Sequence, residues 1–260
     1  SLTPDNCRSN IGRTGTSLSK VMNKPLHPAL FTFTVLPAIT AAVVAVFLTM
    51  EDESDLARYA AVLSLSYIVG SVPWGYMLLQ WRRGVDIRDY GSGSIGMTNV
   101  LRTGGGKFAA AVLLLDFGKG VLAVLLARQI IDSTAGEITA GLAVLVGHNW
   151  PVFLGFRGGR GIATGLGSLV MMAPIAAAIG LSAFIPITIV SRYLSLGSVL
   201  GVVITCIAII GLGLAGIYSS GYSVYAVFTM SIIIWQHRAN MRRIRNGTER
   251  RLGQSATQAN

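Results

Sequence analysis

Charged residues are scarce in this chain. They account for 12% of its 260 residues, about half of the share that a soluble domain carries, whereas hydrophobic residues account for 52%. Acidic residues are the scarcer charged class, with 11 Asp and Glu against 21 Lys and Arg, so the formal net charge is +10. This composition excludes an ordinary soluble domain and predicts an all-α polytopic membrane protein.

The chain also has few residues that form disulfides or bind metals. Its two cysteines, Cys7 in a polar tail and Cys206 in an apolar run, lack the spacing of a disulfide or a metal site. Asp86 and Asp89 are too few, and lie too close to Arg88, to form a metal site. We therefore expect no metal and no other cofactor. The basic residues cluster between apolar runs and form no groove with aromatic residues, so we also expect no nucleic acid partner.

Long apolar runs predict the membrane crossings, because about 20 apolar residues span the hydrocarbon layer. Candidate helices occur at 29–50, 56–80, 108–127 and 138–156, followed by an apolar region at 162–236. The link at 51–55 is acidic and the segment 81–107 is basic, which places 81–107 in the cytoplasm by the positive-inside rule. We expect about seven to eight transmembrane or partly spanning helices in the lipid bilayer, with glycine-rich cytoplasmic loops.

The region 162–236 should contain an even number of crossings, because the arginine-rich segment after it is also cytoplasmic. It shows three apolar pieces, 162–190, 196–217 and 221–236, and Pro174 divides the first into two short helices. We expect 162–190 to enter the membrane and return to the same side. Four polar segments then gather on one membrane face, namely 82–107, 156–164, 191–198 and 237–251.

The stretch YGSGSIGMTNVLRTGGGKF at 90–108 is built like a site for a phosphate. Its glycines leave backbone amides free to face an anion. Short hydroxyl and amide side chains add hydrogen-bond donors, and Arg102 offers a planar fork that suits phosphate oxygens. The pattern is neither a Walker sequence nor a dinucleotide fingerprint. A flexible loop between two helices explains the glycines alone equally well.

The stretch VGHNWPVFLGFRGGRGIATG at 146–165 repeats this composition. Arg157 and Arg160 lie among glycines, and a helix that begins near Thr164 would direct free amides and the positive end of its dipole toward a phosphate. Two such segments on one face suggest two phosphates. His148 and His237 could each act as a general base, although His148 could instead cap a helix end and His237 could position a substrate.

Asp116 and Lys119 lie three residues apart in an apolar helix, so they share a face and can pair. Ionisable residues within a membrane are costly and usually functional. We interpret these two as a structural ion pair that faces the helix bundle.

Several motifs, in order along the chain, resemble the bacterial acyl-phosphate-dependent glycerol-3-phosphate acyltransferase family. The matching stretches are YIVGSVPWGYML, DIRDYGSGSIGMTNVLRTGGGK, DFGKG, GHNWPVFLGFRGGRGIATGLG, SRYLSLGS and HRANMRRIRNGTE. They extend from Tyr67 to Glu249, about 70% of the chain. Members of the family are integral membrane enzymes that transfer a fatty acyl group from acyl phosphate to glycerol 3-phosphate, which gives lysophosphatidic acid in phospholipid synthesis. The resemblance implies these two substrates and an active site on the cytoplasmic side of the bacterial inner membrane.

The motifs of this family carry over to particular residues. Motif one, approximately SGNxGATNxxR, falls on Ser92, Gly93, Gly96, Thr98, Asn99 and Arg102. Motif two, approximately GHxxPVFxxFKGGKGxAT and associated with glycerol phosphate binding, falls on 147–164, and motif three falls on His237, Arg238, Asn240 and Glu249. The resemblance implies catalytic roles for Ser92, Arg102, His148, His237 and Asn240. It implies substrate binding by Gly91, Gly93, Gly96, Thr98, Asn99, Arg157, Gly158, Gly159, Arg160, Gly161, Thr164, Ser195 and Arg238.

The chain departs from these motifs where Ser94 replaces Asn, Met97 replaces Ala, and Arg157 and Arg160 replace Lys. The arginines keep the charge, whereas Ser94 and Met97 leave an inactive paralogue open. A transporter of a phosphorylated solute is another alternative, although the chain shows no internal repeat and gathers its polar groups at one face. The expected divisions are a polar cytoplasmic tail at 1–28, an extra N-terminal helix with an acidic external link at 29–55, an acyltransferase-like membrane domain at 56–251 and a polar C-terminal tail at 252–260.

Overall fold

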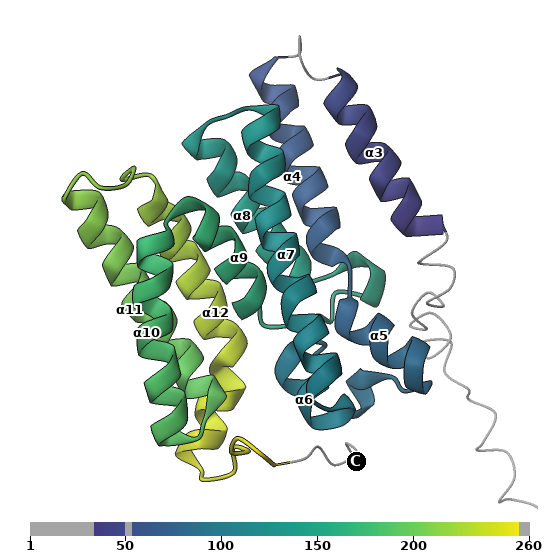
Figure 1. Cartoon of the computed structure of the whole chain (residues 1–260), viewed down its shortest axis with the longest axis vertical. Coiled ribbons are helices and arrows are strands. Elements are labelled where there is room, and N and C mark those ends of the chain that lie inside the picture. Colours follow the sequence, from purple (N-terminus) through teal and green to yellow (C-terminus); the bar gives the residue numbers. More distant parts are fainter. Residues whose placement is uncertain (1–33, 50–53, 255–260) are drawn as a thin grey trace, which may run out of the picture.

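The computed structural model describes residues 34–49 and 54–254. Every regular element in this part of the chain is helical, which confirms the predicted all-α class (Figure 1). The α-helices are α3 (Leu36–Thr49), α4 (Asp55–Ser71), α5 (Trp74–Arg83), α6 (Met97–Gly104), α7 (Gly106–Ile130), α8 (Thr134–Asn149), α9 (Ile162–Met172), α10 (Pro174–Ser191), α11 (Leu194–Leu214) and α12 (Tyr222–Arg245). Two short 3-10 helices, η3 (Ile87–Asp89) and η4 (Val152–Leu154), lie in the loops.

Four helical segments of the described part are long and apolar enough to cross a membrane: 55–83, 106–130, 174–191 and 194–214. Together with α3, α8, α9 and α12 they agree with the predicted seven to eight full or partial spans. The helix expected at 29–50 contains α3, whereas the tail at 1–28 and most of the acidic link lie outside the described residues. Of the tail at 252–260, the structure describes only 252–254.

The crossing predicted at 56–80 is broken at Pro73, which separates α4 from α5. A proline disfavours helical geometry in the residue before it, and Val72 is extended, with φ −63° and ψ 116°. The carbonyls of Gly70 and Val72 accept hydrogen bonds from Nζ of Lys119 at 2.9 and 3.2 Å. Lys119 also lies 3.0 Å from Asp116, and both side chains are 3% exposed. The predicted buried ion pair is therefore confirmed, and it also satisfies the carbonyls at the helix break.

The helix predicted at 138–156 ends earlier than expected, because α8 stops at Asn149. The following residues, WPVFLGF, are apolar and look helical by composition, but Pro151 disfavours helical geometry at Trp150. The chain then turns at Gly155, with φ 60°. The loop on this side therefore runs from 150 to 161, and His148 lies in the last turn of α8.

The region 162–191 forms two helices that run in opposite directions, as predicted (Figure 1). They are separated at Ala173, and Pro174 begins α10. The sequence predicted two short helices here. Helix α9 is short, with 11 residues, but α10 has 18 residues and is long enough to span a membrane. The Ser195 hydroxyl donates to Oε1 of Glu249 at 2.9 Å, which places 191–198 at the same end of the bundle as the C-terminal segment.

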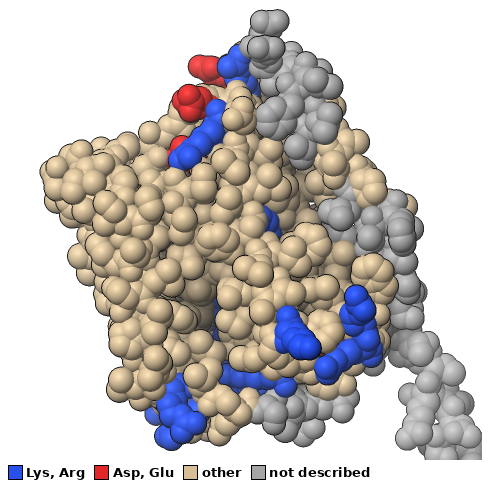
Figure 2. Space-filling view, in the orientation of Figure 1, with Lys and Arg blue, Asp and Glu red and all other residues tan. Residues whose placement is uncertain are grey.

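Helix α9 packs so closely against the central helix α7 that the backbones of the two helices are in contact. A Cβ at Gly120 would lie 2.1 Å from the carbonyl oxygen of Thr164, and one at Gly167 would lie 2.1 Å from that of Phe117. These two glycines allow the close approach and hold the first turns of α9 beside α7. On the face shown in Figure 2, the larger group of visible Lys and Arg lies toward α5, α6 and the last turn of α12, and Asp and Glu lie at the opposite end. We call the first of these the basic end.

Candidate active site

The four polar segments predicted to gather on one face meet at the basic end. Side chains from all of them line one cavity, which we call the polar cavity. Its walls include Ser92, Thr98, Arg102, His148, Arg160, Ser195, His237 and Glu249. These residues come from the α5–α7 connection, the end of α8 and the loop after it, the start of α11, and α12 with the segment that follows.

The loop before α6 is organised by one amide side chain. Oδ1 of Asn99 accepts from the backbone N–H of Ser92 at 3.2 Å, while Nδ2 donates to the carbonyls of Ile87, Tyr90 and Ser94 at 3.2, 2.9 and 2.9 Å. Asn99 is 1% exposed, and the positive φ angles of Gly91 and Gly93 produce the turn around it. Asn99 therefore fixes the position of Ser92 at the polar cavity. Gly91 shapes the turn but does not itself line this cavity.

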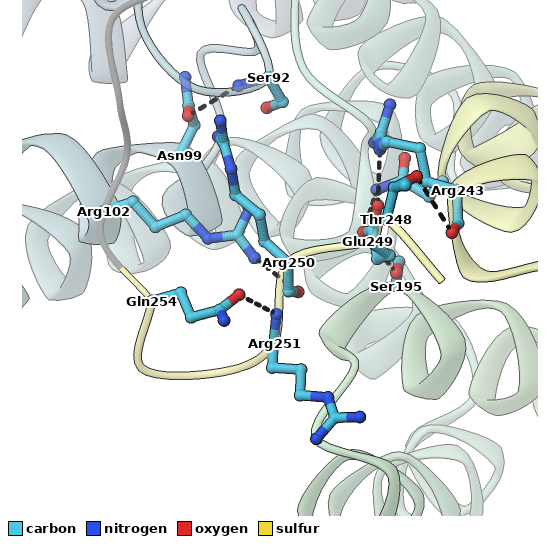
Figure 3. A network of polar contacts seen from close by, with 11 residues as sticks. Ser92, Asn99, Arg102, Ser195, Arg243, Thr248, Glu249, Arg250, Arg251 and Gln254 are labelled. Atoms are coloured by element: carbon cyan, nitrogen blue, oxygen red, sulfur yellow. Dashed lines mark hydrogen bonds and ion pairs between the residues drawn. The ribbon is translucent and has the colours of Figure 1, made fainter. Parts of the chain in front are cut away.

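Arg102 projects from α6 toward the segment that follows α12 (Figure 3). Its Nη2 donates to the carbonyl of Arg250 at 3.3 Å. Burial lowers the pKa of its guanidinium, while the nearby charge of Glu249 raises it. Arg102 thus presents a partly desolvated charge to the polar cavity, where an anion would be held strongly.

The loop after α8 folds back on the end of that helix. The backbone N–H groups of Gly158 and Gly159 donate to the carbonyls of Asn149 and His148 at 3.2 and 3.0 Å. Gly161, with φ +82°, then directs the chain into α9. Between these glycines, Arg160 reaches the polar cavity. Burial lowers its pKa to about 10, so the guanidinium still carries its charge near pH 7.

Glu249 connects two of the four polar segments, 191–198 and 237–251 (Figure 3). Its Oε1 accepts from Oγ of Ser195 at 2.9 Å and from Nδ2 of Asn240 at 2.6 Å, and its Oε2 accepts from Nε of Arg243 at 2.7 Å. Burial would raise the pKa of this carboxyl, but the hydrogen bonds from Asn240, Arg243 and Ser195 lower it below its ordinary value. Glu249 was not among the predicted site residues. Two signals were available, namely its place in motif three and its position as the one acid in an arginine-rich segment.

Both predicted histidines lie at the polar cavity. His148 is 3% exposed, and its Nδ1 lies 3.5 Å from Oδ1 of Asp116 rather than on a helix-end carbonyl. His237 is 2% exposed, and its Nδ1 lies 2.8 Å from the carbonyl oxygen of Ile233. A carbonyl oxygen can only accept, so the proton of neutral His237 resides on Nδ1, which leaves Nε2 as an acceptor.

A second cavity, which we call the basic cavity, adjoins the first and shares Ser92, Ser94 and Arg160 with it. Its other charged and amide side chains are those of Arg88, Asp89, Arg157, Gln236, Arg238, Asn240 and Arg243, and Gly158 and Gly159 also line it. Arg88 is paired with Asp86 at 2.7 Å. Arg238 stacks 4.3 Å from the Trp235 ring and donates to its carbonyl, which holds the guanidinium near the surface.

A third cavity, which we call the apolar cavity, continues from the polar one into the bundle. Helices α9, α10, α11 and α12 form most of its wall. It shares with the polar cavity the residues Met97, Leu113, Ile162, Ala163, Phe184 and Ser198. The basic, polar and apolar cavities thus follow one another from the basic end toward the inside of the bundle. This arrangement can hold an anionic head group with an attached hydrocarbon chain.

The structure therefore brings most of the predicted site residues to the polar or basic cavity. Gly91 and Thr164 are the exceptions, because neither lines either cavity; Thr164 is fully buried in the first turn of α9. Among the described residues, no group of three or more His, Cys, Asp and Glu side chains is placed to hold a metal ion.

Comparison with known proteins gives a consistent result. A family model described as glycerol-3-phosphate acyltransferase matches residues 60–247. A glycerol-3-phosphate acyltransferase from Thermoanaerobacter pseudethanolicus is 41% identical over 197 residues, covering 75% of this chain and 97% of that protein. One from Parasynechococcus marenigrum is 44% identical over 200 residues, covering 75% and 90%. The glycerol 3-phosphate form of PlsY (YgiH), an integral membrane glycerol 3-phosphate acyltransferase, superposes with a TM-score of 0.69 at 33% identity and covers 75% of this chain and 96% of that one. Its lysophosphatidic acid form gives a TM-score of 0.68.

Proposed function

The chain belongs to the glycerol-3-phosphate acyltransferase family, and from that premise we propose that it transfers a fatty acyl group from acyl phosphate to glycerol 3-phosphate. The products are lysophosphatidic acid and inorganic phosphate, in phospholipid synthesis. The observation that carries the proposal is the continuity of the basic, polar and apolar cavities. An acyl phosphate has the matching order of parts, with a phosphate, a reactive carbonyl and a long hydrocarbon chain.

The electrostatics of the site support a reaction between two phosphate-bearing substrates. Two unit charges about 4 Å apart repel by about 4 kcal/mol at an effective dielectric constant of 20. Several cations are needed to offset this repulsion. Arg102 and Arg160 at the polar cavity, with Arg157 and Arg238 at the basic cavity, provide them.

We assign the phosphate of the donor to the loop at 91–102. Ser92 and Thr98 would donate hydrogen bonds to it, and Arg102 would stabilise the charge of the departing phosphate. The acyl chain would extend past Met97 into the apolar cavity. This placement leaves the carbonyl carbon at the junction of the polar and apolar cavities.

The phosphate of glycerol 3-phosphate fits the basic cavity, where Arg157, Arg160 and Arg238 lie among Gly158 and Gly159. From there, His237 and Asn240 could direct a glycerol hydroxyl at the carbonyl carbon. The hydroxyl oxygen forms the new ester bond, the bond between the carbonyl carbon and the phosphate oxygen breaks, and phosphate leaves with that electron pair. The hydroxyl proton passes to a base, for which His148, His237 and a substrate phosphate oxygen are the candidates.

The arrangement in the membrane follows from charge. We place the basic end on the cytoplasmic side of the bacterial inner membrane, because Lys and Arg mark cytoplasmic loops. Glycerol 3-phosphate would then arrive from the cytoplasm, and the acyl phosphate from the bilayer.

The test is turnover by the purified protein, supplied with palmitoyl phosphate and glycerol 3-phosphate, with palmitoyl coenzyme A as the comparison donor. We expect equal amounts of phosphate and lysophosphatidic acid from acyl phosphate and none from the thioester. Arg102→Ala should reduce kcat by about 100-fold or more. Arg83→Ala is the matched control, because Arg83 stacks on Phe108 and lines none of the three cavities. Binding of both substrates without turnover would indicate an inactive paralogue, and glycerol 3-phosphate uptake by proteoliposomes would indicate a transporter.

A further inference from the structure

The end of the apolar cavity that lies away from the polar cavity is bounded by packed side chains, and we call it the closed end. From the polar cavity the apolar cavity runs along α11 from Ser198 to Ile209, with α9, α10 and α12 as its other walls. At its far end, Leu169, Ala177, Cys206, Ile209, Tyr225 and Ala226 line the cavity and also belong to a packed cluster that continues into Met172, Ala173 and Ala176. A hydrocarbon chain in this cavity would therefore meet a packed wall.

The wall suits a hydrocarbon chain, because most of the side chains that line it are apolar. Three of the four hydroxyls that line it donate to backbone carbonyls: Ser198 to Leu194 at 2.8 Å, Thr205 to Gly201 at 2.9 Å and Tyr225 to Gly165 at 2.9 Å. Helices α10 and α11 are held together by small residues, since a Cβ at Gly180 would lie 1.9 Å from Oγ1 of Thr205. The close contact of these helices fixes the width of the cavity.

The length of the cavity can be expressed in carbon atoms. Ile209 lies eleven residues after Ser198 on α11, which corresponds to about 16 Å at a rise of about 1.5 Å per residue. A fully extended chain advances about 1.2 Å per bond, as the polypeptide backbone does over its three bonds per residue. The cavity therefore holds about 13 bonds beyond the level of Ser198. With the first two or three carbons at the carbonyl, it matches an acyl group of about 14 to 16 carbons.

Ala177 on α10 and Ala226 on α12 are the smallest side chains at the closed end, and they are 2% and 5% exposed. We propose that these two alanines set the longest acyl chain that the protein accepts, by leaving room for the terminal methyl group. This inference rests on the proposed function, because it concerns the donor of that reaction. Enlarging either alanine should shorten the cavity without altering the arginines at its other end.

The experiment compares saturated acyl phosphates of 8 to 18 carbons as donors for the wild type, Ala177→Leu and Ala226→Leu. For the wild type, we expect kcat/KM to rise up to about fourfold per methylene (about 0.8 kcal/mol) and to level off near 14 to 16 carbons. In each variant the plateau should move about three carbons shorter. The rate with the 16-carbon donor should then fall tenfold or more, while the rate with the 10-carbon donor stays within about twofold.

Ala178→Leu is the matched control, because Ala178 is the next residue of α10 and is exposed on the outside of the bundle. It should keep the wild-type profile. If Ala177→Leu does not fold, Ala226→Leu and the smaller change Ala177→Val test the same wall from α12 and α10. Folded variants whose chain-length profile equals that of the wild type would overturn the inference.

A second readout separates this inference from the proposed reaction. Alkyl phosphates of 8 to 18 carbons cannot donate an acyl group, but they should stabilise the wild type against heat up to the same limiting length. The limit should be shorter in Ala177→Leu. A length limit that moves in this way, in a protein that turns over no acyl phosphate, would refute the proposed reaction and support the role of the two alanines in limiting chain length. Turnover of acyl phosphate with the same length limit in the wild type and in Ala177→Leu would support the proposed reaction and refute the role of the two alanines.

Discussion

Gly159→Ala adds one methyl group where the loop after α8 touches His148. The new Cβ would lie 1.9 Å from Nε2, 2.7 Å from Cε1 and 2.8 Å from Cδ2 of the imidazole, whereas ordinary contact begins near 3.4 Å. Either the ring or the loop must move by about 1.5 Å. The ring is 3% exposed and faces Asp116 at 3.5 Å. We therefore expect the loop to move, although its N–H groups are bonded to the end of α8.

The cost has two parts. Overpacking of a buried contact typically destabilises a protein by about 1–3 kcal/mol. The neighbouring Arg160 would be displaced from the polar cavity, and a misplacement of about 1 Å can cost about 100-fold in rate. We expect the loss in kcat/KM to appear mainly as a raised KM for glycerol 3-phosphate, because the moved loop lines the basic cavity.

The assay is steady-state turnover with glycerol 3-phosphate varied at fixed acyl phosphate, together with thermal unfolding in detergent. Gly118→Ala is the control, because it makes the same chemical change on α7, where nothing lies within 4 Å of the added Cβ. It should match the wild type in activity and be equally or slightly more stable. Unchanged KM and unfolding temperature in Gly159→Ala would refute the contact with His148 as a constraint on the site.

Three further changes test other parts of the structure. Lys119→Met removes the lysine partner of the buried carboxylate of Asp116 and leaves it only His148, 3.5 Å away. The change should cost about 3–5 kcal/mol, measured as a lower unfolding temperature; an unchanged temperature would contradict the role of the pair. Glu249→Gln removes a carboxylate whose pKa is lower in the folded protein than its ordinary value. The ionised carboxylate therefore stabilises the fold at pH values above the ordinary pKa, and this stabilisation is lost as the pH falls through the pKa of the folded state. The unfolding temperatures of wild type and Glu249→Gln should therefore differ most near pH 7 and converge as the pH falls below the ordinary pKa of a glutamate. A difference that does not change with pH would exclude ionisation as the cause. Tyr222→Phe removes a hydrogen bond to Glu137 at the end opposite the basic end, so stability should fall by about 1 kcal/mol while turnover stays at the wild-type rate.

The parts of the fold that the sequence could predict depend on local or one-dimensional properties. Apolar length and loop charge predicted the helices and placed four polar segments at one end. The pair of Asp116 and Lys119 was visible because three residues bring side chains to one face of a helix. Pro174 predicted the division between α9 and α10 for a similarly local reason.

The features that the sequence could not predict depend on contacts between distant residues. The carbonyls of Gly70 and Val72 accept hydrogen bonds from Lys119, and Glu249 accepts one from Ser195 on another helix. The apolar cavity was not predicted either. The helices around it are apolar on most faces, so side chains that face lipid, core or cavity have the same composition.

The two departures from motif one lie where an active enzyme can accommodate them. The hydroxyl of Ser94 accepts from the N–H of Gly96 at 3.4 Å, and its carbonyl accepts from Asn99 at 2.9 Å, so residue 94 still helps to shape the loop. Met97 lies where the polar and apolar cavities join, and its unbranched thioether can adapt to a hydrocarbon chain. Neither change removes a cation from the cavities. Since the charges that offset two phosphates are retained, we expect Ser94 and Met97 to affect the fit of the donor rather than to abolish the reaction.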